Sequence, residues 1–355
     1  MKVALIGVGQ AGGKLAEALA RHDLARDSVT GALAVNSART DLQSLQIDTL
    51  LVGQNRVKGH GVGGDNELGA EVMQADSQEV MGALDGRITS TAEAIVLVAG
   101  LGGGTGSGGA PVLAHELKRV YDIPVYVLGI LPGRDEGSLY QKNAGRSLKT
   151  LAREADSTIL IDNDAWRSSG ESMTEGYAEI NANIAQRIGL LFAAGESRDG
   201  VAENVVDTSE IINTLRGSRL AAVGYASAAA SEDANENLNA ITSVTRNALL
   251  TGTSLPDATD AEAALLIVAG RPDRISRKGV EAARSWLEDE LDSMQVRGGD
   301  VPLQSDRLAA LVLLGGVERS PRVQAFMERA RAASEEIEHE DATESLVSDE
   351  LDGLF

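Results

Sequence analysis

Cysteine is absent from this 355-residue sequence, and aromatic residues make up only 3% of it. Without cysteine the protein has no disulfide framework, no cysteine-bound zinc, no iron–sulfur cluster and no thiol nucleophile. The shortage of aromatics leaves Val, Leu, Ile and Ala to build the core. Any chemistry must therefore use carboxylates, hydroxyls or backbone amides.

Lysine is scarce as well, with 7 of the 32 basic residues against 25 arginines. The formal net charge is −21, which repels phosphodiester backbones and anionic lipid headgroups. We therefore expect no nucleic-acid partner. A dense carboxylate surface repels itself unless cations screen it, so the composition also predicts a salt-rich cytoplasm.

Long apolar runs are missing too. No stretch reaches 18 consecutive apolar residues, and residues 1–13 lack the charged segment, long apolar segment and cleavage site of a secretory signal. We therefore expect a cytoplasmic protein. Glycine, in contrast, occurs 39 times and hydrophobic residues reach 43%, which is typical of a globular α/β protein with glycine-rich loops.

Apolar runs alternate with helical stretches through the first half of the chain. They predict buried parallel strands, with helices such as those expected at 14–21 and 110–119 covering both faces of a sheet. The strands are predicted at 2–8, 32–36, 95–100, 125–131 and 158–162. Ligands bind beyond the carboxyl ends of parallel strands, and the glycine-rich loops follow those ends.

The rest of the chain divides into three segments. Apolar residues at helical spacing predict a connecting helix within 172–203, helical from 172 to 194. A smaller α/β domain follows at 204–331, with strands at 263–269 and 308–315 and a helix at 277–294. The larger domain is then 1–171, and 332–355 is expected to be an acidic disordered tail. Residues 334–355 hold nine acidic residues and no Lys or Arg. Of the net charge of −21, a charge of −12 therefore remains on residues 1–333.

The first glycine loop has the spacing G-x-G-x-x-G at Gly7, Gly9 and Gly12. That spacing between a strand and a helix is a weak dinucleotide-binding signal. The acid expected for a ribose hydroxyl is missing, because Asn36 and Ser37 follow the second strand. A tight turn without a ligand is the alternative interpretation.

The second glycine loop, residues 102–108, reads GGGTGSG between a predicted strand and a predicted helix. Each glycine costs roughly 1 kcal/mol where it displaces a helix former. Exposed backbone amides at a helix start form an anion site for a di- or triphosphate, and Thr105 and Ser107 can add hydroxyl donors. No Lys-Ser or Lys-Thr pair follows, so this is not a Walker A loop. A flexible linker is the alternative, but strand and helix flank the loop closely.

The GGGTGSG segment resembles the signature of the tubulin/FtsZ superfamily of polymerising GTPases, and the resemblance extends in order over about residues 1–330. It implies an α/β fold with a Rossmann-like GTPase domain on a parallel sheet, a long central helix and a second smaller α/β domain. It also implies that GTP or GDP is contacted by four loops, through Gly9, Gln10, Ala11, Gly12, Gly13 and Lys14, Asn36, Gly63 and Gly64, and Gly102, Gly103, Gly104, Thr105, Gly106 and Ser107.

The same resemblance implies ribose contact through Glu136 and guanine recognition through Asn163, Tyr177 and Asn181. Two asparagines can bond the donor edge and an acceptor of guanine while a tyrosine covers the ring. Tyr177 and Asn181 are four residues apart and therefore share one helix face. A turn residue and a solvated helix position are the plainer interpretations of the two asparagines.

Asp207 and Glu210 precede an apolar pair and by themselves predict a helix start with a capping box. In the resembled family this loop enters the nucleotide pocket of the next subunit, where its acids polarise the water that attacks the γ-phosphate. The resemblance therefore makes both residues catalytic, with Mg²⁺ held mainly by phosphates. Asn204 is less well supported, because it lies three residues before Asp207 and not two. The four histidines show no metal-binding spacing, and no G-x-S-x-G elbow occurs.

Within the superfamily the sequence most resembles CetZ, a tubulin-like group of salt-loving archaea, through its Gln10-Ala11-Gly12 loop, Asp207 with Glu210, and its acidity. This resemblance implies head-to-tail filaments that control cell shape. An FtsZ-type division ring and a non-polymerising nucleotide-binding scaffold are the alternatives. The apolar residues within 351–355 are a candidate membrane or adaptor contact that would place filaments at the cell periphery; a simply disordered end is the alternative.

Overall fold

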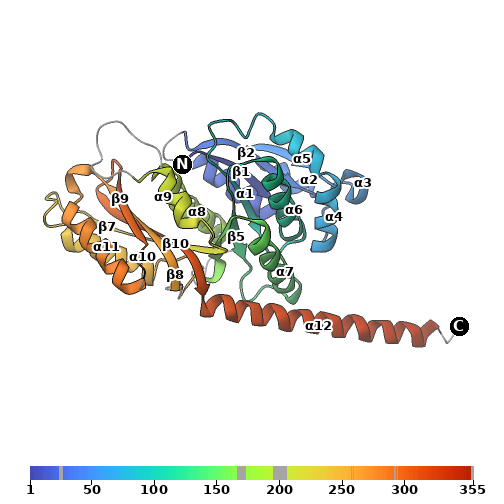
Figure 1. The fold of residues 1–355 in the computed structure, drawn as a ribbon. Helices are drawn as coiled ribbons and strands as arrows, with labels where there is room; N and C mark the ends of the chain where they lie inside the picture. Colours follow the sequence, from blue (N-terminus) through green and yellow to red (C-terminus); the bar gives the residue numbers. More distant parts are fainter. Residues whose placement is uncertain are drawn as a thin grey trace.

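A computed structural model describes residues 1–23, 27–165, 173–194, 206–256, 258, 260–291, 293 and 295–352 (Figure 1). One 10-stranded sheet runs through these residues in the order β3-β2-β1-β4-β5-β6-β7-β10-β8-β9. Its strands are β1 Val3–Val8, β2 Val29–Asn36, β3 Asp48–Leu51, β4 Ala94–Gly100, β5 Val125–Leu131, β6 Ser157–Asp162, β7 Leu220–Ala229, β8 Asp260–Gly270, β9 Val296–Pro302 and β10 Arg307–Arg319.

The helices connect and cover these strands. They are α1 Gly9–Arg21, α2 Arg39–Leu42, α3 Gln54–Val57, α4 Asn66–Ala75, α5 Ser77–Leu84, α6 Gly104–Val120, α7 Ser138–Glu154, α8 Met173–Ala194, α9 Thr208–Leu215, α10 Leu238–Leu250, α11 Arg277–Leu291 and α12 Pro321–Asp352, with short 3₁₀ turns at Asn163–Ala165 and Pro272–Arg274.

The first six strands form a parallel sheet, as predicted from the sequence, although β3 was not among the five strands predicted. In β1, Val3 and Leu5 belong to one core cluster, whereas Ile6 and Val8 belong to the other. Because alternate side chains point to opposite faces, a strand covered on both sides must be apolar throughout. The continuous apolar runs thus correctly predicted a doubly covered sheet.

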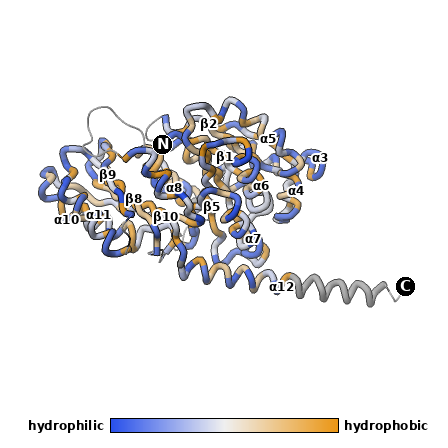
Figure 2. The backbone as a smooth tube through the Cα atoms, in the orientation of Figure 1, coloured by the Kyte–Doolittle hydropathy of each residue, from blue (hydrophilic) through white to orange (hydrophobic). Residues whose placement is uncertain are grey.

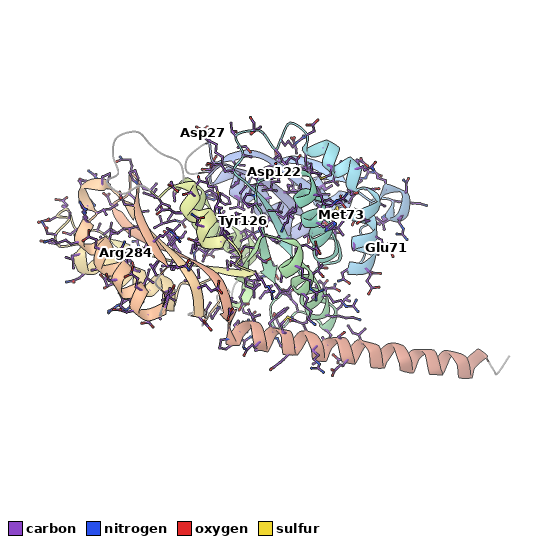
Figure 3. All side chains as sticks on the ribbon, in the orientation of Figure 1. Asp27, Glu71, Met73, Asp122, Tyr126 and Arg284 are labelled. Atoms are coloured by element: carbon purple, nitrogen blue, oxygen red, sulfur yellow. The ribbon has the colours of Figure 1, made fainter. Side chains whose placement is uncertain are left out.

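Helices divide between the two faces (Figures 1 and 2). Helices α1, α8 and α9 supply apolar side chains to one core cluster, and α4 to α7, α10 and α11 supply them to the other. Tyr126 on β5 is only 2% exposed, whereas charged side chains such as Glu71 and Arg284 point outward from helices (Figure 3). The carboxyl edge of the sheet is left to the loops.

The second α/β unit is also present, but its sheet is mixed. Strand β10 pairs antiparallel with β7 and β8, β8 pairs parallel with β9, and β7 joins β6 through only two residue pairs. The predicted strands at 263–269 and 308–315 are the centres of β8 and β10. Strands β7 and β9 were not predicted, because one is rich in alanine and the other contains Gly298 and Gly299, so neither shows a β-branched run.

Two helices begin earlier than predicted. Helix α1 starts at Gly9 instead of residue 14, and α6 starts at Gly104 instead of residue 110. A Cβ on Gly12 would lie 2.1 Å from the Val98 carbonyl oxygen, and a Cβ on Gly108 would lie 2.1 Å from that of Asn66. These glycines permit close packing within a helix, so their low helix propensity was a misleading signal.

The tail is also corrected. Disorder was predicted over 332–355, whereas α12 runs from Pro321 to Asp352; residues 353–355 lie outside the described residues. Residues 322–352 contain neither Gly nor Pro and are rich in Ala and Glu, which favour helix despite the charge. Phe326 anchors the helix in the core, and a Cβ on Gly145 of α7 would lie 2.6 Å from that of Ala330. Among the described residues, none of the helices combines the length and apolarity that crossing a membrane requires.

Candidate nucleotide-binding site

The two glycine loops meet at the carboxyl edge of the sheet. Gly9 has a φ of +75°, a conformation that disfavours side chains, and a Cβ there would lie 2.9 Å from the Gly106 nitrogen. A Cβ on Gly106 would lie 2.5 Å from the Gly100 carbonyl oxygen and 3.2 Å from that of Val8. The loops after β1 and β4 are therefore in backbone contact, and only glycine permits it.

The loop before α4 joins them. A Cβ on Gly104 would lie 2.9 Å from the Gly64 carbonyl carbon. Asn143, on α7 and only 2% exposed, donates from Nδ2 to the carbonyl oxygens of Gly64 at 2.7 Å and Gly102 at 2.9 Å. Gly63 itself is exposed. One buried amide thus fixes two loops, and in the sequence it is visible only as a polar residue within a helix.

The loop after β2 lies against the loop after β1 and against the glycine-rich loop 102–108. Asn36 donates to Asp41 Oδ2 at 3.0 Å and accepts from the Ser37 amide, while Gln10 donates to Asp41 Oδ1 at 3.0 Å. Asp41 therefore connects the loop after β1 with the loop after β2, and it was not predicted from the sequence. The Ser37 and Thr105 hydroxyls are 2.7 Å apart and link the loop after β2 to the glycine-rich loop 102–108.

The hydroxyls of the glycine-rich loop are used within the protein. Thr105 is 8% exposed and bonds Ser37, and Ser107 is 1% exposed and donates to the Gly103 carbonyl oxygen. Gly103 differs from its neighbours, because a Cβ there would meet nothing within 4 Å and its φ of −74° suits any residue. Protein packing therefore does not require glycine at this position, which faces open space.

The electrostatics of this edge favour an anion. Helices α1 and α6 both begin here, and neither has an acid in its first turn. Their free amides and dipoles carry partial positive charge. Ala11 and Lys14 are exposed on α1, while Gly12 and Gly13 are buried beneath them. The arrangement suits phosphate groups bound mainly by backbone N–H groups.

Two of the predicted ribose- and base-binding residues, Glu136 and Asn163, lie farther along the same edge, after β5 and β6. Asn163 follows β6 directly and is 9% exposed. Glu136 accepts from the Gly133 amide at 2.8 Å, and the Arg134 amide donates to Asp164 at 3.1 Å, so the loops after β5 and β6 are joined. On α8, Tyr177 is 38% exposed and Asn181 is half-buried.

Asp207 and Glu210 form the capping box predicted for them at the start of α9. Asp207 Oδ1 accepts from the Glu210 amide at 3.0 Å, and Glu210 Oε2 accepts from the Asp207 amide at 3.2 Å. The Ser209 hydroxyl bonds Asp207 and lowers the pKa of that carboxyl below its ordinary 3.8, whereas desolvation raises the pKa of Glu210 above 4.5. Asn204 lies outside the described residues.

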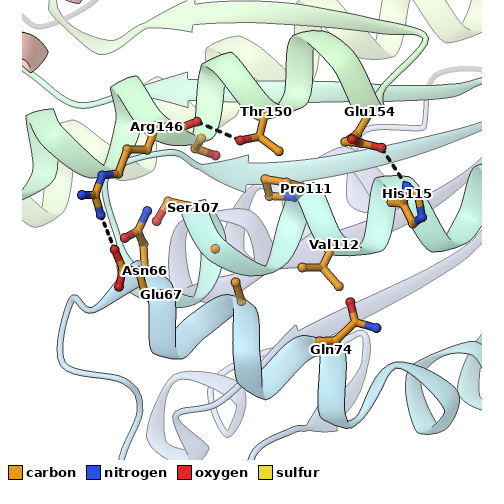
Figure 4. Close-up of a pocket in the computed structure, with 13 residues that line it drawn as sticks. Asn66, Glu67, Gln74, Ser107, Pro111, Val112, His115, Arg146, Thr150 and Glu154 are labelled. Atoms are coloured by element: carbon orange, nitrogen blue, oxygen red, sulfur yellow. Dashed lines mark hydrogen bonds and ion pairs between the residues drawn. The ribbon is translucent and has the colours of Figure 1, made fainter.

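A separate cavity of about 450 Å³ lies between α4, α6 and α7 (Figure 4). Arg146 pairs with Glu67 at 2.6 Å and His115 with Glu154 at 2.8 Å along its sides. Its lining includes Ser107 and Gly108 of the glycine-rich loop and the first turn of α4, and extends along the helices as far as His115 and Glu154, away from the sheet edge. We therefore assign the nucleotide to the loops and not to this cavity.

Comparisons with known proteins agree with this geometry. Residues 2–171 match the GTPase domain of the tubulin/FtsZ family, and residues 170–332 match the C-terminal domain of tubulin-like CetZ. The chain is 66% identical to tubulin-like protein CetZ2 of Haloferax volcanii, with 100% of both chains covered.

Solved structures show the same relationship. CetZ2 of Haloferax volcanii, in a GTPγS-bound protofilament, is 67% identical with a TM-score of 0.91, covering 95% of this chain and 100% of that one. CetZ1 of the same organism, a GDP-bound monomer, is 48% identical with a TM-score of 0.87, covering 94% and 100%. An FtsZ dimer of M. jannaschii, 21% identical with a TM-score of 0.73 and covering 89% and 88%, shares the fold. The chain therefore belongs to the tubulin/FtsZ family and carries the CetZ-type C-terminal domain.

Proposed function

We propose that the protein binds and hydrolyses GTP and assembles head to tail into cytoskeletal filaments. The observation that carries this proposal is the convergence of the glycine loops on one sheet edge in a chain that is 67% identical to CetZ2, whose structure is a GTPγS-bound protofilament. Guanine selectivity is assigned to Asn163, Asn181 and Tyr177, and ribose contact to Glu136.

Mg²⁺ is part of the proposal. Among the described residues, no group of three or more His, Cys, Asp or Glu could hold a metal ion. We propose that a cation at this site is held mainly by phosphate oxygens and water, a manner of binding that Mg²⁺ favours. When bound it would neutralise charge on the phosphates, while the backbone amides near Gly103 and Gly104 position them.

Hydrolysis is proposed to need two subunits. Asp207 and Glu210 lie at the start of α9, and the phosphate loops lie at the carboxyl edge of the N-terminal sheet. The carboxylates of Asp207 and Glu210 in one subunit would orient a water molecule in the nucleotide site of the adjoining subunit. The oxygen of this water attacks the γ-phosphorus as the bond from phosphorus to the β–γ bridging oxygen breaks. The products are GDP and inorganic phosphate, and turnover requires assembly.

Light scattering and phosphate release, measured together against protein concentration in concentrated KCl, test this function. We expect GTP to cause scattering and phosphate release above the same critical protein concentration, and GDP to cause neither scattering nor phosphate release. GTP binding without scattering or turnover would instead indicate a nucleotide-binding scaffold, in which the capping box of Asp207 and Glu210 only starts a helix.

Assembly is expected to strengthen as salt increases. A subunit of charge −21 must bind both a polyanionic nucleotide and another subunit of the same charge. Raising the ionic strength from about 0.1 M to about 1 M shortens the screening length from about 10 Å to about 3 Å. The critical concentration for scattering with GTP should therefore fall over this range, the reverse of an association driven by opposite charges. A rise would contradict the screening argument.

Turnover is expected to decline on mild acidification. Because desolvation raises the pKa of Glu210 above 4.5, its charged form is lost at a higher pH than for a free glutamate. The lowered pKa of Asp207 keeps that carboxylate charged over the same range. The same shifts affect folding stability. The raised pKa of Glu210 stabilises the folded state below pH 4.5, and this contribution is lost as pH rises through the pKa. The lowered pKa of Asp207 stabilises the folded state above pH 3.8, and this contribution is lost as pH falls through the pKa. The pH profile of phosphate release by preformed filaments measures the decline of turnover, and Glu210→Gln should remove the acidic limb of that profile.

Cell-shape control, a cytoplasmic location with filaments at the cell periphery, and a membrane or adaptor contact through residues 351–355 complete the proposal. The first follows from the resemblance of the sequence to CetZ, and the last is supported by the apolar residues at the end of an acidic segment. Deleting the gene should alter shape with septation intact, whereas a division-ring protein would be needed for septation.

A further inference from the structure

The C-terminal helix reaches the base-binding turn through one arginine. Arg322, in the first turn of α12 and 6% exposed, pairs with Asp162, whose side chain is 2% exposed. Its Nε bonds Asp162 Oδ2 and its Nη2 bonds Asp162 Oδ1 at 2.9 Å, so the contact is bidentate. The two residues are 160 positions apart in sequence.

The same guanidinium also holds the other side of Asn163. Arg322 Nη2 bonds Asp164 Oδ2 at 2.7 Å, and the Asp164 amide donates to Asp162 Oδ1 at 3.2 Å. Asn163 therefore lies between two aspartates that share one arginine. The turn is fixed from both sides by a residue that belongs to another part of the chain.

The surrounding charges show why this residue cannot be replaced easily. Arg134 also contacts Asp164, with its Nε at 3.3 Å, but its side chain is 64% exposed. Bonding to Asp162 raises the pKa of Arg322 although burial opposes this, whereas burial lowers that of nearby Arg329. Of these three arginines, Arg322 is the one that combines burial with bonds to both aspartates, and a planar fork is needed to bond Asp162 twice.

We propose that Arg322 is a positioning residue for base recognition, holding Asp162 and Asp164 so that Asn163 is presented to the guanine. This inference rests on the proposed function, in which Asn163 reads the base. It makes guanine selectivity depend on the docking of α12, which is anchored on α7 near Gly145 and in the core at Phe326. Arg322 itself need not touch the nucleotide.

Arg322→Lys in the full-length protein tests the proposal, because lysine keeps the charge but not the fork. GTP and ATP affinities are measured by competition against a fluorescent GTP analogue. We expect the ratio of GTP affinity to ATP affinity to fall by about tenfold, through weaker GTP binding. Arg331→Lys is the matched control, because Arg331 lies on the same helix, is 83% exposed and pairs with Glu335 one turn farther along it.

A merely structural role would lower both affinities in proportion, and that result would overturn the proposal, as would unchanged GTP binding. Thermal unfolding with circular dichroism checks that the variant folds. If it does not fold, Asp164→Asn, at a side chain that is 20% exposed, supplies the second test, with a smaller fall in the same ratio expected and no fall overturning it. If the unaltered protein binds ATP as well as GTP, the proposed function fails first and this inference with it.

Discussion

Glu210→Gln should reduce GTP turnover by about 100-fold or more while GTP binding and filament assembly remain. The substitution removes the carboxylate charge that would polarise the attacking water. It retains an oxygen that can accept the Asp207 amide, so the capping box at the start of α9 is preserved. Chemistry and helix stability are thereby separated, which Glu210→Ala does not achieve, because alanine also removes the acceptor of the Asp207 amide.

Phosphate release per pelleted subunit measures this effect, with filament mass from sedimentation. Glu281→Gln is the control, since Glu281 is an exposed carboxylate that pairs with Arg277 on α11. Turnover near the unaltered rate in Glu210→Gln filaments would remove Glu210 from the mechanism. Full turnover by dilute monomers of the unaltered protein would contradict the shared site itself.

Local pattern was sufficient to predict most of the N-terminal parallel strands, but not β3, β7 or β9. Strand β5 was predicted with its observed bounds, because a buried parallel strand is apolar over its whole length and its neighbours are turn-forming. The helix starts predicted at residues 14 and 110 were wrong, because the helices begin at Gly9 and Gly104. Propensity describes a chain in water, whereas these glycines are helical because backbone from another element lies within about a side chain's width.

The site was predictable in part. Glycine loops and the asparagine after β6 are signals within a few residues, so a resemblance could find them. Asp41, Asn143 and Arg322 were missed, because each acts on a loop that is distant in sequence or is visible only as a side-chain contact. Polar side chains that are buried to hold loops show no spacing of their own, and only the fold reveals them.

Gly103→Ala should weaken GTP binding by about tenfold or more without a matching loss of stability. A Cβ at Gly103 meets no protein atom within 4 Å, and the backbone there has a φ of −74° that alanine adopts freely. The added methyl group would therefore project into the space assigned to the phosphates. Gly106→Ala differs, because its Cβ would lie 2.5 Å from the Gly100 carbonyl oxygen and should disturb the fold itself.

The comparison of these two variants is what makes the test informative, because it separates glycine needed for packing from glycine needed for a ligand. Isothermal titration with GTP and thermal unfolding in its absence supply the two measurements. Gly82→Ala, in α5 with no atom within 4 Å of a new Cβ, controls for adding a methyl group far from the loops. If Gly103→Ala binds GTP as tightly as the Gly82 variant, the phosphates do not approach Gly103, and backbone binding at the start of α6 is excluded.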